Sequence, residues 1–251
     1  MRARRPAGNP SGVHFLSARP VIAALLRSAR LGPGQLVVEF GAGPGIITAP
    51  LARTGARVLA VERDAEFVRR LHRRFADQPS VRVVHADLRT VPLPRRAYHV
   101  VANLPFAVST ATLRRLLDPA DTPVAGADLI VEWGLARRLS QVSDGTTPAR
   151  DAGTAWWAAR FDLRLARRIP ASAFSPAPRV DAAHLVIRPR PLPRSATRHL
   201  STLLRAGYRM PERSVQAVLS TVVPPRRAHR IARSTGIPPP TPTNHLTVPD
   251  W

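Results

Sequence analysis

The chain has 251 residues, and its 38 basic against 16 acidic side chains give a formal net charge of +22 at pH 7. This length allows one large domain, or a catalytic domain with a small appendage, and the charge favours a polyanion such as nucleic acid as the partner. The absence of cysteine excludes disulfides, thiolate zinc sites and thiolate nucleophiles.

The N-terminal part of the chain predicts an arm followed by a helix. Residues 1–15 are basic, small and polar, which is typical of a flexible segment. Apolar residues recur at helical spacing over 20–31, and the apolar stretch 21–26 is too short to span a membrane or to act as a signal sequence. We therefore expect a soluble, cytoplasmic protein that makes no membrane contact.

Short apolar strands then alternate with helix-like segments. The strands are predicted at 35–40, 57–62, 81–85, 98–102 and 127–132, and the helices at 46–53, 65–75 and 110–117. Alternation of this kind indicates βαβ units, so the sequence predicts an α/β fold with a Rossmann-like parallel sheet.

Beyond residue 137 the alternation weakens. Residues 140–153 have loop composition, and two more strands are predicted at 161–166 and 184–188. A linker at 189–193 precedes Arg-rich helices over 197–223 and 228–234, and the Pro-rich remainder is expected to be unstructured. The predicted organisation is an arm (1–15), a catalytic domain (16–189), a small basic helical domain (190–235) and a tail (236–251).

A glycine turn, Gly41-Ala42-Gly43-Pro44-Gly45, joins the first predicted strand to a helix. Glycine leaves the backbone N–H groups at a helix N-terminus free for a nucleotide-like ligand. Glu62 ends the next strand, where a carboxylate accepts hydrogen bonds from ribose hydroxyls. Asp87 ends the third strand, where S-adenosylmethionine (SAM) enzymes place an acid for the adenine amine. NAD-binding domains share the first two features, but the three together favour SAM as the cofactor.

The tetrad Asn103-Leu104-Pro105-Phe106 follows the fourth strand and so belongs to the same edge of the sheet. The side-chain oxygen of Asn103 and the carbonyl of Leu104 would accept both hydrogens of an adenine N6 amine and free its lone pair for attack on a methyl group. Pro105 fixes φ and helps to hold the carbonyl outward, and Phe106 offers a stacking face. No general base is demanded, because the alkylated amine is acidic enough to lose its proton to water. Together with the glycine turn, the tetrad predicts methyl transfer to adenine.

In this order the motifs resemble the adenine-N6 rRNA methyltransferases, which include the erythromycin-resistance (Erm) methylases of 23S rRNA and the small-subunit dimethyladenosine transferases. The resemblance covers roughly residues 9–235. It is nearer to the Erm branch in Ser109-Thr110 and in the segment from Val131 to Arg138. It implies a SAM-dependent methyltransferase sheet with a small C-terminal helical domain. The implied activity is N6-methylation of one adenine near the peptidyl-transferase centre of 23S rRNA, with resistance to macrolides, lincosamides and streptogramin B.

The resemblance also implies the residues that hold the ligands. Phe174 is similar to an aromatic residue that would sandwich the target adenine against Phe106. The implied SAM contacts are His14, Leu16, Gly41, Ala42, Gly43, Glu62, Arg63, Asp87, Leu88 and Asn103. Many members have Gln-Asn-Phe-Leu near the N-terminus, where this chain has Val13-His14-Phe15-Leu16, so it departs from the family pattern at His14.

The implied partner is 23S rRNA, either protein-free or as an assembly intermediate, bound by a monomer without a metal ion. The target adenine must be unpaired or flipped to reach a pocket, which suits an RNA loop or bulge. Clustered arginines would contact phosphates and make binding salt-dependent. These are Arg2, Arg4 and Arg5; Arg114 and Arg115; Arg137 and Arg138; Arg164, Arg167 and Arg168; and Arg205, Arg209 and Arg213.

Three alternatives stay open. A DNA adenine-N6 methylase would normally have Pro where this chain has Leu104. A small-subunit rRNA dimethyltransferase shares every chemical element of the predicted site. A non-catalytic RNA-binding factor with the same fold would be expected to have lost the cofactor residues, which this chain retains.

Overall fold

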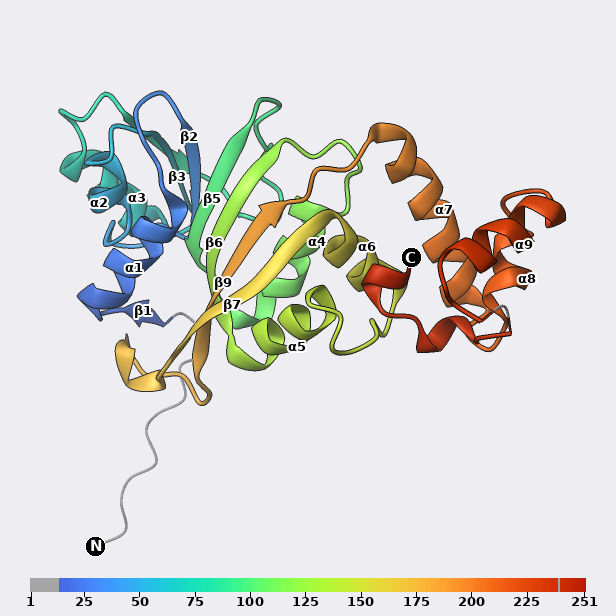
Figure 1. Cartoon of the computed structure of the whole chain (residues 1–251). Coiled ribbons are helices and arrows are strands. Elements are labelled where there is room, and N and C mark those ends of the chain that lie inside the picture. The colour runs from blue at the N-terminus through green and yellow to red at the C-terminus, as the bar shows by residue number, and fades with distance from the viewer. Residues whose placement is uncertain (1–13, 239) are drawn as a thin grey trace, which may run out of the picture.

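The computed structural model describes residues 14–238 and 240–251 and is built on a seven-stranded sheet with the order β4-β3-β2-β5-β6-β9-β7 (Figure 1). The strands are β2 (Leu36–Phe40), β3 (Arg57–Glu62), β4 (Val81–His85), β5 (Tyr98–Asn103), β6 (Val124–Glu132), β7 (Phe161–Ile169) and β9 (Ala182–Pro189). The neighbouring strands in the part of the sheet from β4 to β6 pair in parallel. Strand β9 runs antiparallel to both of its neighbours, β6 and β7. The predicted α/β class with a Rossmann-like sheet is confirmed.

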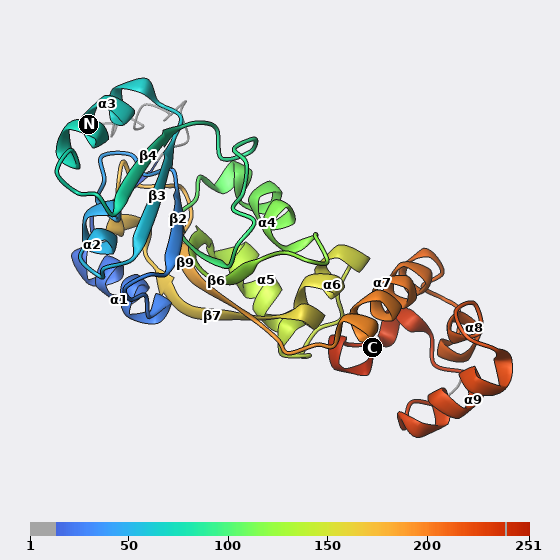
Figure 2. The same ribbon diagram turned by 90° about the horizontal axis from the view of Figure 1, so that it is seen from above.

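Helices cover both faces of the sheet (Figure 2). On one face lie α1 (Arg19–Ala29), α2 (Thr48–Ala52) and α3 (Ala65–Arg74), and on the other α4 (Ser109–Leu117), α5 (Trp133–Ser143) and α6 (Ala152–Arg160). Val101 packs with the first group and its neighbour Val100 with the second, because successive strand residues point to opposite faces. Burial on both faces explains why the parallel strands read as nearly continuous apolar runs.

Three further helices lie at the end of the molecule away from β4 (Figure 2): α7 (Arg194–Arg209) packs beside α6, α8 (Val215–Leu219) on α7, and α9 (Pro225–Ser234) on α8. Leu204 of α7 joins the core beneath α4 to α6, whereas Val215, Ala228 and Ala232 form a smaller cluster between α8 and α9. A C-terminal helical region is thus present. The domain boundary at residue 190 stays a prediction, because α7 shares the larger core.

The C-terminal segment has a defined structure, so the expectation of an unstructured tail over 236–251 is wrong for the described residues 240–251. They contain the short 3₁₀ helices η3 (Thr243–His245) and η4 (Val248–Asp250). Trp251 stacks on Tyr208 of α7 with the ring centroids 6.1 Å apart, and Leu246 is buried. Proline-rich composition argues against regular ladders of hydrogen bonds, but it does not prevent spaced apolar side chains from packing on a helix.

Other boundaries also differ from the predicted ones. Only the stretch between Ser143 and Ala152 is loop, because α5 continues into the predicted loop and Asp151 caps α6 by accepting a hydrogen bond from the Thr154 amide at 2.8 Å. Most of the predicted N-terminal arm, residues 1–13, lies outside the described residues, while Phe15–Leu16 form the short strand β1. Among the residues that the structure describes, no helix is long and apolar enough to cross a bilayer.

Candidate active site

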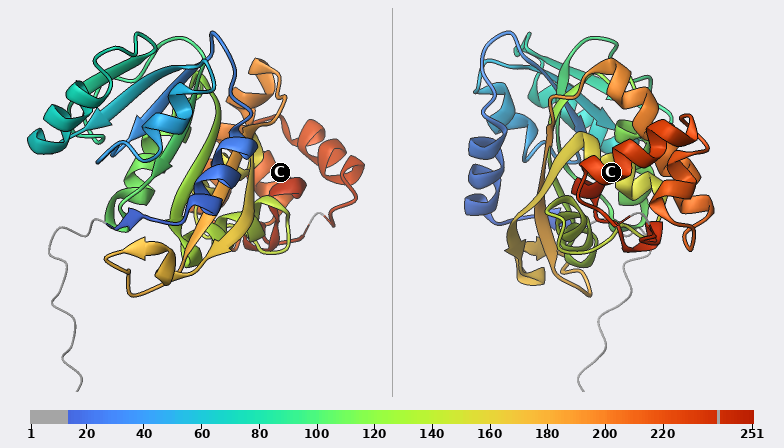
Figure 3. Two further views of the ribbon diagram at one scale, coloured as in Figure 1. Left: turned by 90° about the vertical axis from the view of Figure 1, so that its left-hand side faces the viewer. Right: turned by 45° about the vertical axis from the view of Figure 1, so that its right-hand side comes forward.

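The predicted site residues gather at the carboxyl edge of the parallel strands, where open α/β sheets bind their ligands. A two-stranded sheet lies beside this edge, because β1 pairs antiparallel with β8 (Phe174–Ser175). The N-terminal segment and residues 174–175 therefore lie side by side below the main sheet (Figure 3). Residues 15–16 and 174–175, from opposite ends of the catalytic region, thus meet beside the carboxyl edge of the sheet.

The glycine turn has a backbone that glycine adopts with little strain. Gly41, Gly43 and Gly45 have φ angles of +70°, +52° and +81°, in the left-handed region. A Cβ atom on Gly43 would lie 3.1 Å from the Phe15 ring, and one on Gly41 would lie 4.0 Å from the Asn103 carbonyl. Glycine at position 43 therefore allows β1 to approach the turn closely, whereas a Cβ on Gly41 would make only an ordinary contact with the tetrad.

The carboxylate of Glu62 holds this turn in place. Its Oε2 accepts a hydrogen bond from the Gly43 amide at 2.8 Å, and its Oε1 accepts from the amides of Arg63 and Asp64 at 2.7 and 2.8 Å. The residue is 7% exposed. Each carboxylate oxygen keeps further acceptor capacity, so Glu62 can bind a ribose hydroxyl without releasing the turn.

Asp87 follows β4 and is already paired with Arg89. Its Oδ2 lies 2.6 Å from Nη2 of Arg89, and its Oδ1 accepts from the Arg89 amide at 2.8 Å. The hydrogen bonds from Arg89 lower the pKa of Asp87 to about 2. The main-chain N–H of Leu88 makes no hydrogen bond with any other described residue. The ionised Asp87 carboxylate and the free Leu88 amide therefore lie next to each other, and Arg89 already occupies part of the carboxylate.

The tetrad presents two oxygen atoms at the end of β5. Nδ2 of Asn103 donates a hydrogen bond to the main-chain carbonyl of His14 at 2.8 Å. A carbonyl can only accept, so this bond fixes the amide orientation and leaves Oδ1 as the free acceptor. Leu104 has a buried side chain and donates its N–H to Ile130 at 3.0 Å, while its carbonyl makes no hydrogen bond within the described chain. Pro105, at φ −57° and ψ 130°, follows directly.

The aromatic residues at this edge differ from the expected sandwich. Phe106 begins the 3₁₀ helix η1 (Phe106–Val108) and is partly exposed. Phe174 is only 4% exposed, because its ring packs in the core on the α1 to α3 face. The ring that faces Phe106 is that of His14, at a centroid distance of 6.1 Å and a tilt of 36°. The stacking role of Phe174 stays a prediction, and it requires the ring to leave the core.

Comparison with known proteins identifies the class of this site. Residues 9–251 match the family model described as ribosomal RNA adenine dimethylase. The chain belongs to this family. It is a SAM-dependent rRNA adenine-N6 methyltransferase, so a DNA methylase and a non-catalytic RNA-binding factor are set aside.

Relatives of two kinds resemble this methyltransferase. The mycinamicin-resistance protein MyrB of Micromonospora griseorubida is 33% identical over 96% of this chain and 75% of its own length. The ribosomal RNA small subunit methyltransferase A of Synechococcus sp. (strain JA-3-3Ab) is 32% identical over 96% of this chain and 88% of its own. The solved structure of the 23S rRNA methyltransferase ErmE has a TM-score of 0.78 at 23% identity, covering 94% and 96% of the two chains, which shows the shared fold.

The polar groups of the methyltransferase fit SAM. The acceptors at Glu62 and Asp87 and the donor at Leu88 suit the ribose and adenine of the cofactor. The expectation of free N–H groups in the glycine turn is wrong, because the amides of Gly41 and Ala42 donate to Val61, that of Gly43 to Glu62 and that of Gly45 to Ala42.

Of the other predicted contacts, Ala42 is buried, and the Arg63 carbonyl lies 3.0 Å from a ring nitrogen of His85. Leu16 of β1 is buried, and in the backbone pairing it lies opposite Phe174 of β8.

Sequence reasoning missed Glu39, a buried acid in β2. It is 1% exposed and its Oε2 accepts a hydrogen bond from the Thr48 hydroxyl at 2.6 Å. Burial raises the pKa of Glu39 to about 8; the bond from Thr48 opposes this rise and the charge of Glu62 adds to it. The sequence feature that could have revealed Glu39 is its position as an acid inside an otherwise apolar predicted strand. Glu39 supports the helix that follows the glycine turn, because Thr48 begins α2.

The predicted RNA-contact arginines are spread over several elements. Arg115 donates to the carbonyls of Leu88 and Val91, so it belongs to the fold and not to a free surface. The guanidinium carbons of Arg137 and Arg168 lie 5.3 and 4.9 Å from the centroid of the Trp133 ring. The other described members of the predicted clusters are exposed: Arg114, Arg138, Arg164, Arg167, Arg205, Arg209 and Arg213. Arg2, Arg4 and Arg5 lie outside the described residues.

Proposed function

We propose that this methyltransferase transfers one or two methyl groups from SAM to N6 of a specific adenine in 23S rRNA near the peptidyl-transferase centre. The modification would give resistance to macrolides, lincosamides and streptogramin B. The observation that carries the catalytic part is the pair of free oxygens on Asn103 and Leu104, beside the glycine turn. We further propose that the enzyme acts in the cytoplasm as a monomer and without a metal ion.

The cofactor residues have distinct proposed roles. Glu62 accepts from the ribose, Asp87 accepts from the cofactor adenine amine, and the Leu88 amide donates to its ring. The bound cofactor supplies an electrophilic methyl group. The protein must then bring the target amine to that methyl and hold it there, because in-line transfer depends mainly on proximity and orientation.

The tetrad is proposed to activate the target amine. Adenine N6 is a poor nucleophile, because its lone pair is delocalised into the ring. Oδ1 of Asn103 and the carbonyl of Leu104 accept one hydrogen each, which draws the nitrogen toward tetrahedral geometry and localises the lone pair. Pro105 holds the Leu104 carbonyl outward, and Phe106 stacks on the base.

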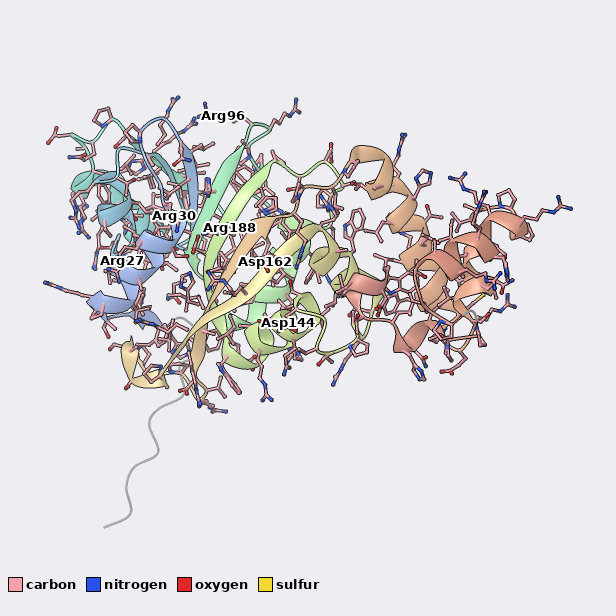
Figure 4. The ribbon with its side chains drawn as sticks, viewed as in Figure 1. Arg27, Arg30, Arg96, Asp144, Asp162 and Arg188 are labelled. Carbon is pink, nitrogen blue, oxygen red and sulfur yellow. The ribbon has the colours of Figure 1, made fainter. Side chains whose placement is uncertain are left out.

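The charge distribution supports an RNA substrate. Nitrogen-tipped side chains project around α7 to α9 (Figure 4). On α9, Arg226, Arg227, Arg230 and Arg233 are exposed, and no carboxylate of the described chain pairs with them. Residues 190–235 contain one acid, Glu212. Unpaired guanidinium groups bind phosphates at a modest desolvation cost, so we propose that this region contacts the rRNA backbone.

The choice of 23S over 16S rRNA rests on sequence segments near the site. Ser109 and Thr110 begin α4, which follows the tetrad after the short helix η1, and Val131 to Arg138 connect β6 to α5 at the same edge. Both segments are similar to the Erm branch, and MyrB is named for drug resistance. The second candidate is a small-subunit dimethyltransferase, which the relative from Synechococcus favours.

Drug susceptibility tests the resistance part of the proposal. The enzyme is expressed in a macrolide-sensitive bacterium, with Asn103→Ala expressed to the same level as the matched control. We expect the inhibitory concentration of a macrolide, a lincosamide and a streptogramin B to rise with the wild type and not with the variant. Wild-type protein that methylates rRNA without changing susceptibility to any of the three would contradict the resistance assignment.

A further inference from the structure

Three side chains from α5 and β7 form a cluster at the carboxyl edge of the sheet. The guanidinium carbon of Arg137 lies 5.3 Å from the centroid of the Trp133 ring, and that of Arg168 lies 4.9 Å from the same centroid. Trp133 begins α5, Arg137 follows about one turn later, and Arg168 stands near the end of β7. Both arginines are exposed, and Trp133 is partly buried. These three residues are called the Trp133 cluster below.

Asp181 holds the Trp133 cluster together. Its Oδ2 accepts a hydrogen bond from Nε of Arg168 at 2.7 Å, and its main-chain carbonyl accepts from the Trp133 amide at 3.0 Å. Its Oδ1 accepts from the Ala171 amide at 2.9 Å. The bonds from Ala171 and Arg168 lower the pKa of the Asp181 carboxyl, so it remains an anion. The ring and one guanidinium are therefore fixed before any ligand binds.

The positive charge of the Trp133 cluster exceeds its negative charge. Asp181 offsets Arg168, whereas Arg137 pairs with no carboxylate of the described chain, the neighbouring Glu132 included. The bond to Asp181 uses Nε of Arg168, so the two Nη nitrogens keep donors for a ligand. Two cations beside one ring repel each other, and an anion between their free edges would relieve this repulsion. A phosphate suits this place, because it accepts paired hydrogen bonds from a guanidinium.

The indole ring prepares the arginines for such a ligand. A guanidinium attracted to the face of a tryptophan ring keeps the N–H groups at its own edge free to donate. An arginine without this support loses much of its rotamer freedom when it binds. The exposed arginines of α9 have no aromatic partner of this kind among the described residues. The Trp133 cluster therefore offers a fixed geometry as well as charge.

The Trp133 cluster lies close to the oxygens proposed to hold the target amine. Asn103 pairs with Ile130 of β6, and Trp133 comes three residues later, which is about 10 Å at the ordinary rise of a strand. Val131 of β6 and Arg168 of β7 pair with the same residue of β9, so Arg168 lies at the same edge of the sheet. A phosphate bound here would belong to a nucleotide near the target adenine.

We propose that the Trp133 cluster binds the backbone phosphate of a nucleotide beside the target adenine and so fixes which adenine enters the pocket. This inference rests on the proposed RNA substrate and adds positioning residues to it. A base leaves its stack by rotation of its backbone, so a fixed neighbouring phosphate favours one rotated nucleotide. The other exposed arginines supply general affinity, whereas this cluster sets the register of the RNA.

RNAs with single neutral linkages test the proposal. A short RNA that the wild type methylates at one adenine is synthesised with one methylphosphonate, which removes the charge of one phosphate, at each linkage near that adenine in turn. Single-turnover rates are measured with saturating SAM. We expect one or two adjacent linkages to lower the wild-type rate about 10- to 100-fold, the range for a lost charge-assisted hydrogen bond. Arg137→Ala should lose a similar factor on unmodified RNA and nothing further at those linkages.

The control is Arg57→Ala, because Arg57 is exposed at the start of β3, on the opposite edge of the sheet. This variant should keep the wild-type sensitivity to the neutral linkages. Trp133→Leu should resemble Arg137→Ala, while Trp133→Phe should keep most of the rate, because a phenyl ring still attracts a guanidinium. Unchanged SAM affinity shows that each variant is folded.

Two results would overturn the inference alone. One is an Arg137→Ala variant that loses the full wild-type factor again at the same linkages, and the other is a wild type that no single neutral linkage slows. A wild type that methylates no RNA would overturn the proposed function together with the inference.

Discussion

Nδ2 of Asn103 lies 2.8 Å from the main-chain carbonyl oxygen of His14, across 89 positions of sequence. This hydrogen bond joins the N-terminal segment to the site, because it fixes the orientation of the Asn103 amide and leaves Oδ1 as the free acceptor. It also predicts that an aspartate at position 103 would be inactive. A carboxylate has no donor for the carbonyl and would repel it.

Asn103 should matter for turnover and not for RNA binding. We expect both Asn103→Ala and Asn103→Asp to lower the single-turnover rate on the order of 10²- to 10³-fold, which is typical for the loss of one oriented polar group. RNA affinity, measured by filter binding, should stay within about threefold of the wild type, since phosphate contacts dominate affinity. A parallel loss of RNA binding would mean that the tetrad is structural.

Asp87 and Arg89 should affect cofactor binding in opposite directions. In the proposed site the guanidinium of Arg89 would compete with the cofactor amine for the Asp87 carboxylate, and an exposed ion pair is worth about 0–1 kcal/mol. We expect Asp87→Asn to weaken SAM binding about tenfold and Arg89→Ala to tighten it by up to about fivefold, measured by calorimetry.

The control for Arg89 is Arg96→Ala, because Arg96 precedes β5 at the opposite edge of the sheet (Figure 4). This variant should leave SAM affinity unchanged. Equal losses in Arg89→Ala and Asp87→Asn would show that Arg89 itself holds the cofactor.

Glu39 should make the free energy of unfolding depend on pH. Its pKa is about 8 in the folded chain against an ordinary value of 4.5, so the folded state keeps a proton that the unfolded chain releases. The raised pKa adds to the free energy of unfolding. This contribution is complete below pH 4.5, the ordinary pKa of the unfolded chain, and is lost as the pH rises through about 8. The limiting slope is about 1.4 kcal/mol per pH unit.

Urea unfolding at pH 5.5 and pH 8 measures this effect. We expect Glu39→Gln to reduce the fall in stability between the two pH values, because the amide does not ionise and can still accept from Thr48. Glu66→Gln on the exposed side of α3 is the control and should retain the wild-type fall. An unchanged pH dependence in Glu39→Gln would exclude a protonated Glu39.

The arginines of α9 should set part of the salt dependence of RNA binding. Arg226 and Arg230 lie one turn apart on the helix and are exposed. Each lost phosphate contact should reduce the slope of log K against log salt concentration by about 0.7 to 0.9. The double variant Arg226→Ser, Arg230→Ser should therefore show a slope shallower by about 1.5.

The matched control is the double variant Arg69→Ser, Arg70→Ser. These two arginines of α3 share the carboxylate of Glu66, which compensates one of their two charges, and they lie on a helix far from α9. We expect this control to keep the wild-type slope. A reduced slope in the control together with a wild-type slope in the α9 variant would place the RNA on the other side of the molecule.

The sequence predicted the sheet because periodicity and turn chemistry are local. Apolar runs ending at Phe40, Glu62 and His85 match β2, β3 and β4, and the glycines of 41–45 adopt the left-handed backbone that their spacing suggested. Parallel pairing then brings their ends to one edge. The tetrad follows β5, so its position could also be inferred.

The remaining features depend on contacts between distant segments. The protonation of Glu39 follows from complete burial, and the pairing of β1 with β8 joins residues far apart in sequence. The burial of Phe174 results from packing against core residues of other elements. Trp251 packs against Tyr208 in a tail whose composition indicated disorder. No local pattern contains this information, because each contact depends on the partner that the fold supplies.

Nucleoside mass spectrometry tests the central claim most directly. Protein-free, unmethylated 23S and 16S rRNA are incubated separately with the purified enzyme and SAM, with Asn103→Ala as the blank, and then digested to nucleosides. We predict N6-methyladenosine or its dimethyl form in 23S rRNA alone. Product in 16S rRNA alone would contradict the 23S assignment and place the enzyme with the small-subunit dimethyltransferases.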